Sequence, residues 1–460
     1  MNFNTQQYQN YFFVGIAGTG MSAIAQYLNG IGKSVAGSDR LFTQTNKMLI
    51  QEQFEKAGIH CFYQDGSGID ANTQVVVVST AIEESNVEYQ KALQLNIPIV
   101  KRSELLAAIS SEKKTIAVGG TSGKSTTTAM IFHILNENGL SPSLITGAGL
   151  TALQKQGLPG NAKVGEGPWL VIESDESDGS IVNYLPETGV VLNIDRDHKE
   201  FDELIALFET FKQNTKGKFI VNNDLEITQK LSVNPQDNFG TIPEAGFAAE
   251  NFNQEGFSIS FTIQEVSFRI PVIGRHNMEN AAAAVAAAHT AGVSVEQSAK
   301  ALRTYEGIYR RTQLVGEHRG IIVIDDFAHN PAEVAAAIKS CQIIGKRVFA
   351  WFQPHGFGPL RFMHEELSEK SAETLRANDT LILSDVYYAG GTVNKDISSE
   401  IVTEAVSKQG KHALFIKDRA QLPAKLADMA EKGDVILLMG ARDPSLSDFA
   451  HSVLNAIKNS

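Results

Sequence analysis

Short runs of strongly apolar residues alternate along this chain with stretches of helix length, and this alternation restricts the fold more than any other feature. The run Val75-Val-Val-Val-Ser79 is typical, because its four consecutive valines leave no polar face. Such a strand is expected where both faces of a parallel sheet are buried. Parallel strands need crossover connections, usually helical, so the pattern predicts doubly wound α/β domains.

The predicted strands fall into three blocks, and 460 residues suggest about three domains. A charged break at 110–114 and the segment after Tyr309-Arg-Arg-Thr312 separate the blocks, so we predict domains 1–110, 111–309 and 310–460. A helix rich in alanine is predicted over 280–291. The expected strands are 11–16, 34–39, 75–79, 97–100, 115–118, 169–172, 190–194, 219–221, 321–325, 348–352, 381–385, 413–416 and 435–438.

Composition excludes several classes of protein. Acidic residues exceed basic residues, 52 against 40, and no long basic run occurs, which disfavours a partner such as duplex nucleic acid. Cys61 and Cys341 are the only cysteines, too few for a disulfide framework or a cysteine-based zinc cluster. Neither a signal peptide nor a membrane-spanning run is recognisable. We therefore expect a cytoplasmic enzyme that has no membrane partner.

A glycine-rich segment, Gly119-Gly-Thr-Ser-Gly-Lys-Ser-Thr126, lies between a predicted strand and a predicted helix. Backbone N–H groups of such a loop wrap phosphate oxygens, while Lys124 supplies charge and the Ser125 hydroxyl can reach Mg²⁺. The strict P-loop spacing requires glycine where this chain has Val118, so the segment is a shortened variant. The alternative is a strand-to-helix turn that is rich in glycine and serine and binds nothing.

Another glycine-rich segment, Gly15-Ile-Ala-Gly-Thr-Gly20, comes earlier in the chain, and we call it the first glycine loop. It resembles the dinucleotide fingerprint, although Ala17 replaces the second glycine of that fingerprint. We expect a phosphate or diphosphate at this helix start and Asp39 near a ribose. A tight turn without a ligand remains the alternative.

Two polar clusters follow predicted strands: Glu173-Ser-Asp-Glu-Ser-Asp178 and Asn193-Ile-Asp-Arg-Asp-His198. The carboxyl ends of parallel strands form the usual active-site edge of an open α/β sheet. Four carboxylates in six residues repel one another unless a cation or solvent intervenes. We expect both clusters to meet the phosphate loop and hold metal, with His198 as a second ligand, against the alternative of a solvated surface.

The order of these motifs resembles that of the Mur ligases of peptidoglycan synthesis, over essentially the whole chain. The motifs that carry the resemblance are Gly120–Thr128, Glu173–Asp178, Asn193–His198, Gly274–Asn280, Tyr309–Arg311 and Asp325–Pro331. Four segments resemble the branch of the family that adds alanine. They are Val14–Ser22, Gly37–Asp39, Phe352–His355 and Asp385–Tyr387.

The resemblance implies three α/β domains: a Rossmann-like N-terminal domain for a UDP-sugar, a central P-loop-type domain for ATP, and a Rossmann-like C-terminal domain for the incoming amine. It also implies roles for individual residues. Nucleotide contacts fall on Gly120, Thr121, Ser122, Gly123, Lys124, Ser125, Thr126, His276, Asn280, Arg311 and Asp326. Metal contacts fall on Ser125, Glu173 and His198, and catalytic roles on Lys124, His198, Arg311 and His329. Substrate contacts fall on Gly15, Ala17, Gly18, Thr19, Gly20, Met21, Ser22, Ser38, Asp39, Ser79, Arg102, His355 and Arg361.

The implied activity is an ATP-dependent ligation that forms a C–N bond. ATP and Mg²⁺ convert the carboxylate of UDP-N-acetylmuramate into an acyl phosphate, which the amine of L-alanine then attacks. Phosphate neutralisation by cations suits the residues of the phosphate loop. Both a monomer and a homodimer remain open.

Departures from the family pattern concern the amine. Ser122 stands where the alanine-adding enzymes typically have histidine, and Gly356-Phe-Gly-Pro-Leu-Arg361 replaces an arginine-containing stretch. Arg361 could supply the guanidinium from a shifted position. A roomier acceptor site would suit the alternative, a ligase that joins UDP-N-acetylmuramate to the murein tripeptide L-Ala–γ-D-Glu–meso-diaminopimelate for recycling.

Two other classes of function compete with a ligase. A nicotinamide-dependent oxidoreductase would explain the first glycine loop but not Lys124, the acidic cluster or His198. A nucleotide-binding protein without catalytic activity would be expected to have lost Lys124, Glu173 or His198, and all three are present.

Overall fold

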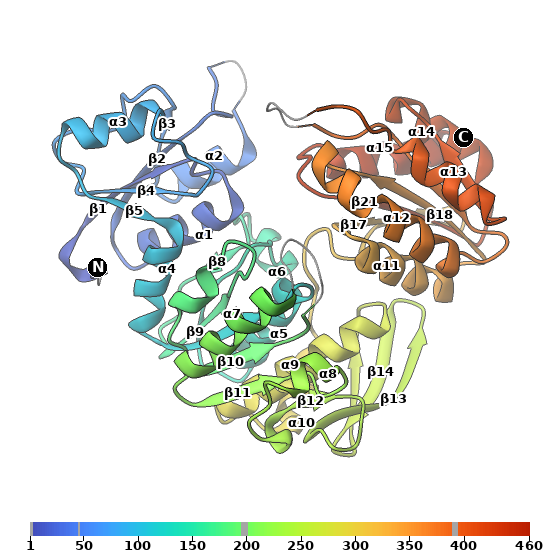
Figure 1. Cartoon of the computed structure of the whole chain (residues 1–460), viewed down its shortest axis with the longest axis horizontal. Helices are drawn as coiled ribbons and strands as arrows, with labels where there is room; N and C mark the ends of the chain where they lie inside the picture. The colour runs from blue at the N-terminus through green and yellow to red at the C-terminus, as the bar shows by residue number, and fades with distance from the viewer. Residues whose placement is uncertain (1–2, 45–46, 195–200, 389–393) are drawn as a thin grey trace. The chain divides into compact units, whose positions relative to one another are not determined.

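The computed structural model describes residues 3–44, 47–194, 201–388 and 394–460 (Figure 1). The chain forms two compact units. The first comprises residues 1–251, 261–269 and 279–308, and the second comprises residues 252–260, 270–278 and 309–460. The first predicted domain and most of the second therefore belong to one unit, whereas residues 252–260 and 270–278 of the second predicted domain belong to the other. Apolar residues of the N-terminal and central sheets join a single hydrophobic cluster. The boundaries at 110 and 309 stay a prediction.

The N-terminal sheet has the strand order β3-β2-β1-β4-β5, and its strands are parallel. Its strands are β1 (Asn10–Val14), β2 (Ser34–Asp39), β3 (His60–Tyr63), β4 (Val75–Val78) and β5 (Ile99–Lys101). Its helices are α1 (Thr19–Gly30), α2 (Leu49–Lys56), α3 (Val87–Gln94) and α4 (Arg102–Ser111), with a 3-10 turn η1 (Thr5–Gln7). Only β3 was not predicted, because this edge strand is partly exposed and lacks a continuous apolar run.

The central sheet has the order β11-β10-β6-β9-β7-β8. Its strands are β6 (Lys114–Gly119), β7 (Ser143–Ile145), β8 (Ala162–Lys163), β9 (Trp169–Glu173), β10 (Thr188–Val191) and β11 (Lys218–Val221). Its helices are α5 (Lys124–Glu137), α6 (Thr151–Gln154), η2 (Ser180–Asn183), α7 (Phe201–Asn214), α8 (Glu226–Gln229), η3 (Pro235–Asp237), α9 (Arg275–Thr290) and α10 (Val295–Leu302). The alanines of α9 are fully buried, so their small size serves close packing. The sequence did not predict the short strands β7 and β8.

A small sheet of order β12-β13-β14-β15 follows the central one and was also not predicted. Its strands are β12 (Phe239–Gly240), β13 (Phe247–Glu255), β14 (Ser258–Ile263) and β15 (Val266–Ile270). In β14 buried and part-buried residues alternate, the pattern of a strand with one face covered. That alternation in Ser258-Ile-Ser-Phe-Thr-Ile263 was a readable signal.

The C-terminal sheet has the order β16-β17-β21-β18-β19-β20. Its strands are β16 (Gln313–His318), β17 (Ile321–Asp326), β18 (Arg347–Gln353), β19 (Thr380–Leu383), β20 (His412–Phe415) and β21 (Asp434–Gly440). Its helices are α11 (Pro331–Ile344), α12 (Phe357–Thr374), α13 (Glu400–Lys408), η4 (Arg419–Gln421), α14 (Leu422–Met429) and α15 (Leu446–Asn459). Separate hydrophobic clusters lie on its two faces.

The C-terminal sheet is parallel except at one edge, which the sequence did not predict. β16 pairs antiparallel with β17, and only Arg319 and Gly320 connect them. Both connecting residues have positive φ, +54° and +74°, as a tight hairpin turn requires. A connection this short cannot cross over a sheet, so the strands must run antiparallel.

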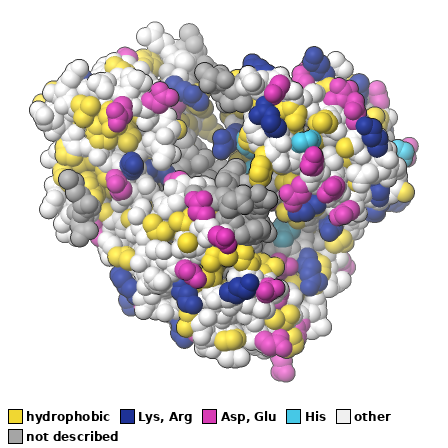
Figure 2. Space-filling view, viewed as in Figure 1, with side chains coloured by type: hydrophobic (Ala, Val, Ile, Leu, Met, Phe, Trp, Pro, Cys, Tyr) yellow, Lys and Arg dark blue, Asp and Glu magenta, His cyan; other side chains and the backbone are white. Residues whose placement is uncertain are grey.

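The surface agrees with the composition. On the face shown in Figure 2, acidic and basic side chains of the described residues are interspersed. Among the described helices, none combines the length and the apolar character needed to cross a lipid bilayer.

Candidate functional site

The phosphate loop lies between β6 and α5, as predicted, at the carboxyl edge of the central sheet. Gly120 and Gly123 have φ of +132° and +86°, conformations that side chains rarely adopt. A Cβ atom on Gly120 would lie 3.1 Å from the backbone of Asn193, and one on Gly123 would lie 2.6 Å from Oδ1 of Asn280. Glycine is therefore required at both positions by backbone conformation and by close packing.

Asn193 holds the phosphate loop in shape. Its Oδ1 accepts hydrogen bonds from the Thr121 hydroxyl and the Ser122 amide, each 2.8 Å, and its Nδ2 donates to the Ser122 carbonyl oxygen at 3.1 Å. The sequence placed Asn193 only within a polar cluster. Its position directly after the strand that neighbours β6 was the signal that could have identified this support.

Lys124, the first residue of α5, has its ammonium group bound within the loop. The Nζ atom donates to the Gly120 carbonyl oxygen at 2.6 Å and contacts both carboxylate oxygens of Glu176 at 3.0 and 3.1 Å. The side chains of Lys124 and Glu176 are 17% and 5% exposed. Burial alone would lower the pKa of Lys124, but the carboxylates of Glu176 and Asp175 raise it, so this lysine stays charged.

The acidic cluster after β9 divides its members between different partners. Glu176 pairs with Lys124, whereas Oε1 of Glu173 accepts hydrogen bonds from the Thr146 hydroxyl and, at 2.7 Å, from the Gly147 amide. Asp178 pairs with Arg102 at 3.1 Å. Protein cations therefore relieve part of the repulsion within the run, because Lys124 pairs with Glu176 and Arg102 pairs with Asp178. The predicted metal-binding role of the cluster stays a prediction.

Two of the three predicted metal ligands, Ser125 and Glu173, lie within the described residues. Ser125 lies in the first turn of α5, and Glu173 ends β9. Within the described ranges, no three His, Cys, Asp or Glu side chains are arranged to hold a metal ion. His198 lies outside the described residues, so its predicted roles in metal binding and catalysis stay predictions.

The first glycine loop connects β1 with α1 and is held by the end of β2. The amides of Gly15 and Ile16 donate to the Ser38 carbonyl oxygen at 2.8 and 3.0 Å, and the Ala17 amide donates to Oδ2 of Asp39 at 2.9 Å. Ser38 has no exposed surface, so in this structure it shapes the loop through its backbone. Oδ1 of Asp39 accepts a further hydrogen bond from the Leu41 amide.

The remaining residues predicted for the UDP-sugar surround this loop. Gly18 precedes α1 as its N-cap, and Thr19, Gly20, Met21 and Ser22 form its first turn. The Arg102 side chain, from the start of α4, lies against Gly20, where a Cβ atom would come within 2.9 Å of Nη1. Ser79 follows β4 directly and is partly exposed.

The two residues predicted near adenine differ in their surroundings. Oδ1 of Asn280 accepts a hydrogen bond from the Thr127 hydroxyl at 3.3 Å, next to the phosphate loop. His276 belongs to the second unit. Burial, helped by the charge of Arg311, lowers the pKa of His276 to about 4, so its imidazole is neutral at pH 7.

In the second unit, residues predicted for the nucleotide gather at the end of β17. Nδ1 of His329 lies 3.0 Å from Oε2 of Glu333, and Nη1 of Arg311 lies 3.9 Å from the other oxygen of that carboxylate. Burial alone would raise the pKa of Glu333, but His329 and Arg311 lower it to about 2. The sequence did not identify Glu333, although its place in the first turn of a helix capped by Asn330 is a typical one for a carboxylate.

The carboxylate of Asp326, which was predicted to contact the nucleotide, also holds the backbone around it. Its carboxylate accepts hydrogen bonds from the amides of Thr312 and Ala328 at 2.5 and 2.7 Å. Burial raises the pKa of Asp326 to about 6. The neighbouring Asp325 forms a buried ion pair with Arg310, Nε to Oδ2 2.9 Å. The sequence motif Tyr309-Arg-Arg311 thus combines a buried structural arginine with the half-buried Arg311.

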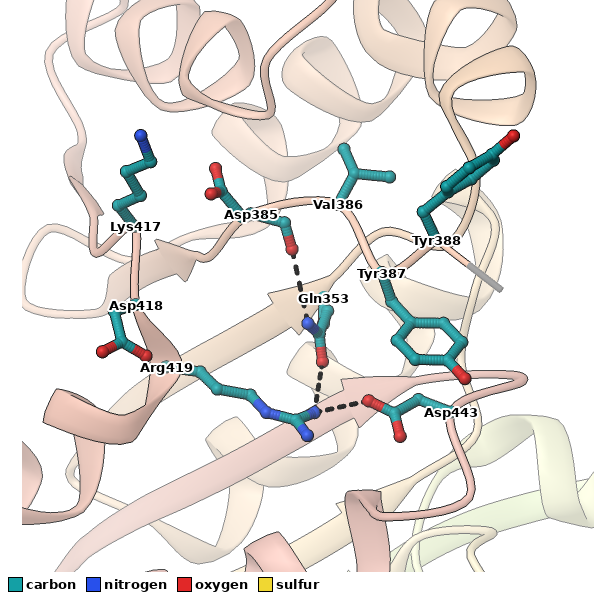
Figure 3. Close-up of a pocket in the computed structure, with 9 residues that line it drawn as sticks. All are labelled: Gln353, Asp385, Val386, Tyr387, Tyr388, Lys417, Asp418, Arg419 and Asp443. Atoms are coloured by element: carbon teal, nitrogen blue, oxygen red, sulfur yellow. Dashed lines mark hydrogen bonds and ion pairs between the residues drawn. The ribbon is translucent and has the colours of Figure 1, made fainter. Parts of the chain in front are cut away.

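A cavity of about 450 Å³ opens beyond the carboxyl ends of the C-terminal strands (Figure 3). Arg419 lies across it and donates to Oε1 of Gln353 at 2.7 Å and to Oδ2 of Asp443 at 2.5 Å, while Tyr387 points toward Asp443. The cavity is lined by Gln353, Asp385, Val386, Tyr387, Tyr388, Lys417, Asp418, Arg419 and Asp443. The sequence had identified only Gln353 and Asp385–Tyr387, because Arg419 and Asp443 belong to none of the recognised motifs.

The predicted acceptor residues lie beside this cavity or away from it. His355 is buried, and its backbone forms an isolated parallel β-bridge with that of Tyr387. The centroid of its ring lies 5.7 Å from the centroid of the His329 ring. Arg361 is exposed and pairs with Asp396. Arg361 does not line the cavity, and its predicted role of replacing the missing guanidinium stays a prediction.

Comparison with families of known proteins gives one consistent result. The model described as "Mur ligase family, catalytic domain" matches residues 10–114, "Mur ligase middle domain" matches 118–288, and "Mur ligase, glutamate ligase domain" matches 310–442. A UDP-N-acetylmuramate–L-alanine ligase of Rhizobium etli is 34% identical over 93% of both chains. One of Streptomyces coelicolor is 35% identical over 97% of both chains.

Solved structures share the fold. The UDP-N-acetylmuramate–alanine ligase of Thermotoga maritima superposes with a TM-score of 0.79 at 24% identity, covering 98% of both chains. A murein peptide ligase of Psychrobacter arcticus gives a TM-score of 0.68 at 21% identity, covering 98% of this chain and 99% of its own.

Proposed function

Because the chain belongs to the Mur ligase family, we propose that it joins the carboxylate of UDP-N-acetylmuramate to the amine of L-alanine at the expense of ATP. The relatives that are about one-third identical over nearly their whole length carry the name of this activity. The observation in the structure that supports it best is Lys124, a charged lysine at the start of α5 in a loop shaped by Asn193. The reaction belongs to the synthesis of peptidoglycan precursors, which places the enzyme in the cytoplasm.

The chemistry requires activation of a carboxylate, which is a poor electrophile. A carboxylate oxygen of the UDP-sugar attacks the γ-phosphorus of ATP, ADP leaves, and an acyl phosphate results. The amine nitrogen then attacks the acyl carbon, the C–N bond forms, and inorganic phosphate leaves as the C–O bond breaks. Lys124 and the backbone amides of the loop neutralise charge on the phosphoryl group in transit.

We propose Mg²⁺ as the metal, bound by Ser125 and Glu173. A hydroxyl and a carboxylate are oxygen donors that Mg²⁺ accepts, and the contacts to Thr146 and Gly147 are made by Oε1 of Glu173. When bound, the ion would neutralise phosphate charge. Glu173 would then have two tasks: it fixes the 146–147 loop through one oxygen and offers the other to the ion.

One observation favours a second candidate, the murein tripeptide as the amine. The cavity beside His355, about 450 Å³, has the size of sites for drug-sized ligands and exceeds what the single methyl group of alanine fills. The glycines Gly356 and Gly358 also remove side-chain bulk at the start of α12.

Amine-dependent release of phosphate tests the proposal. The assay contains the enzyme, ATP, Mg²⁺ and UDP-N-acetylmuramate, with L-alanine, L-serine, glycine or L-Ala–γ-D-Glu–meso-diaminopimelate as the amine. We expect release with L-alanine that stops when the UDP-sugar is left out. Release with the tripeptide alone would establish the second candidate, and release independent of any amine would exclude a ligase.

A further inference from the structure

Arg102 connects the first glycine loop with the acidic cluster of the central sheet. Its Nη1 lies against the first turn of α1, 2.9 Å from where a Cβ atom of Gly20 would stand. Its Nη2 donates to Oδ2 of Asp178 at 3.1 Å. All three residues belong to the first unit. One guanidinium group therefore contacts both the first turn of α1, beside the N-terminal sheet, and the loop that follows β9 of the central sheet.

Asp178 is itself firmly placed. Its Oδ1 accepts a hydrogen bond from the Ser180 amide at 2.9 Å at the start of η2, so the carboxylate cannot rotate freely. The ion pair is only partly exposed, 23% for the Arg102 side chain and 20% for Asp178. An arginine held in this way at one nitrogen keeps its planar group in one orientation, which is the property that makes arginine suited to phosphates.

The first turn of α1 is also fixed from its other side. Nδ2 of Asn161 donates to the Thr19 carbonyl oxygen and to the Ser22 hydroxyl, each at 2.8 Å. The amides of Thr19, Gly20 and Met21 precede the first intrahelical bond, which is made by the Ser22 amide, so they have no carbonyl acceptor within the helix. The turn combines amides that can receive an anion, a rigid anchor and an adjacent oriented cation.

We propose that Asp178 is a positioning residue for the UDP-sugar: it orients the Arg102 guanidinium beside the first turn of α1, where that cation binds the diphosphate. This inference rests on the proposed function, because the diphosphate belongs to the UDP-sugar. It assigns to one carboxylate of the acidic cluster a role that is separate from the binding of metal or ATP. The same ion pair ties the diphosphate site to the loop whose Glu176 pairs with Lys124.

Calorimetric titration of UDP-N-acetylmuramate into the full-length enzyme, without ATP or amine, tests the inference. We expect Asp178→Asn to weaken binding about tenfold, the usual size of a lost charge-assisted contact, and Asp178→Glu to restore most of it. Arg102→Gln should weaken binding at least as much. In the double variant, Asp178→Asn should weaken binding by less than a further twofold, because Asp178 acts through Arg102. Asp237→Asn, which breaks the Lys218–Asp237 pair at the other edge of the central sheet, is the matched control and should bind as the wild type does.

Two further readings separate positioning from a purely structural role. The loss in Asp178→Asn should persist with UDP and vanish with uridine, which has no phosphate for Arg102 to bind. In the complete assay, the KM for the UDP-sugar should rise while kcat changes less than twofold. Equal affinity of Asp178→Asn and the wild type for UDP-N-acetylmuramate, or an equal loss with UDP and uridine, would overturn the inference and leave the proposed function standing. Failure of the wild type to bind UDP-N-acetylmuramate would overturn both.

Discussion

The two glycine-rich loops of the first unit are built alike but obtain their positive charge differently. Each follows an interior strand of its sheet: the first loop follows β1, which lies between β2 and β4, and the second follows β6, which lies between β10 and β9. Each is also shaped by residues at the end of an adjacent strand: Ser38 and Asp39 for the first loop, Asn193 for the second. The second loop contains its own cation, Lys124, whereas the first depends on Arg102 from a different helix.

This difference has a physical consequence. Lys124 is held by Glu176 and by the Gly120 carbonyl oxygen, so its charge is paired before any nucleotide arrives. Incoming phosphate must compete with that carboxylate. Arg102 is likewise paired, but with an acid that leaves its Nη1 side facing α1. A lysine acts as a point charge that can change partner, while an arginine can bind two partners at once.

The largest effect is expected from removing the cation of the second loop. Lys124→Ala should lower amine-dependent phosphate release about a thousandfold, because the transferring phosphoryl group loses its neutralising charge. Binding of the UDP-sugar, measured by calorimetry, should stay as in the wild type. Lys218→Ala, a lysine ion-paired at the opposite edge of the sheet, should keep full activity. Near-normal turnover in a folded Lys124→Ala enzyme would contradict the assignment of this loop.

The next largest effect is expected from removing the carboxylate that pairs with Lys124, because the first loop has no such pair within itself. Glu176→Gln leaves the largely buried Lys124 without its anionic partner and should lower the free energy of unfolding by about 3 kcal/mol. A non-hydrolysable ATP analogue should then stabilise the variant more than the wild type, because the phosphates no longer displace a carboxylate. Urea unfolding with and without the analogue measures both.

The control for this measurement is Glu226→Gln, which removes an exposed ion pair with Lys230. We expect this variant to unfold as the wild type does. If Glu176→Gln and Glu226→Gln have the same stability and the same response to the analogue, the Lys124–Glu176 pair does not compete with the nucleotide.

A pair of smaller effects tests whether the two loops are independent. Asn193→Ala removes three hydrogen bonds from the second loop and should raise the KM for ATP about tenfold without changing the affinity for the UDP-sugar. Asp39→Ala removes the acceptor of the Ala17 amide and should weaken UDP-sugar binding by a similar factor without changing the KM for ATP. Steady-state kinetics and calorimetry separate the two. Equal losses for both substrates in both variants would mean that the loops act as one structure.

The smallest effect concerns the contact between Arg102 and α1. Gly20→Ala places a methyl group against the end of a flexible side chain, which can move by a few tenths of an ångström. We expect UDP-sugar affinity to fall only about threefold. Gly358→Ala, where a Cβ atom would meet no neighbour within 4 Å, is the control and should leave the affinity for the UDP-sugar unchanged. Unchanged affinity in Gly20→Ala would show that the cation does not need this close approach.

Sequence reading succeeded where an element announces itself locally. Continuous apolar runs such as Val75–Val78 identified the buried parallel strands, and the glycines at 120 and 123 identified the turn into α5. The strands β3, β8 and β16 escaped, because they lack a continuous apolar run and depend on pairing with a neighbour. The same limit explains why Asn193 and Glu333 were not singled out, since each acts through partners distant in sequence or across a helix turn.

What the sequence by itself determined is the set of local structures: three successive α/β blocks, two glycine-rich strand–loop–helix turns, and the charged residues that follow the strands. These follow from periodicity, backbone conformation and residue chemistry, which act over a few positions along the chain. Only the tertiary structure decided which charges meet. In the folded chain Lys124 pairs with Glu176, Arg102 with Asp178 and Arg361 with Asp396. Apolar residues of the first two blocks also share one hydrophobic core. The physical reason is that an ion pair depends on distance in space, and the distance between residues 102 and 178 is set by the packing of two sheets.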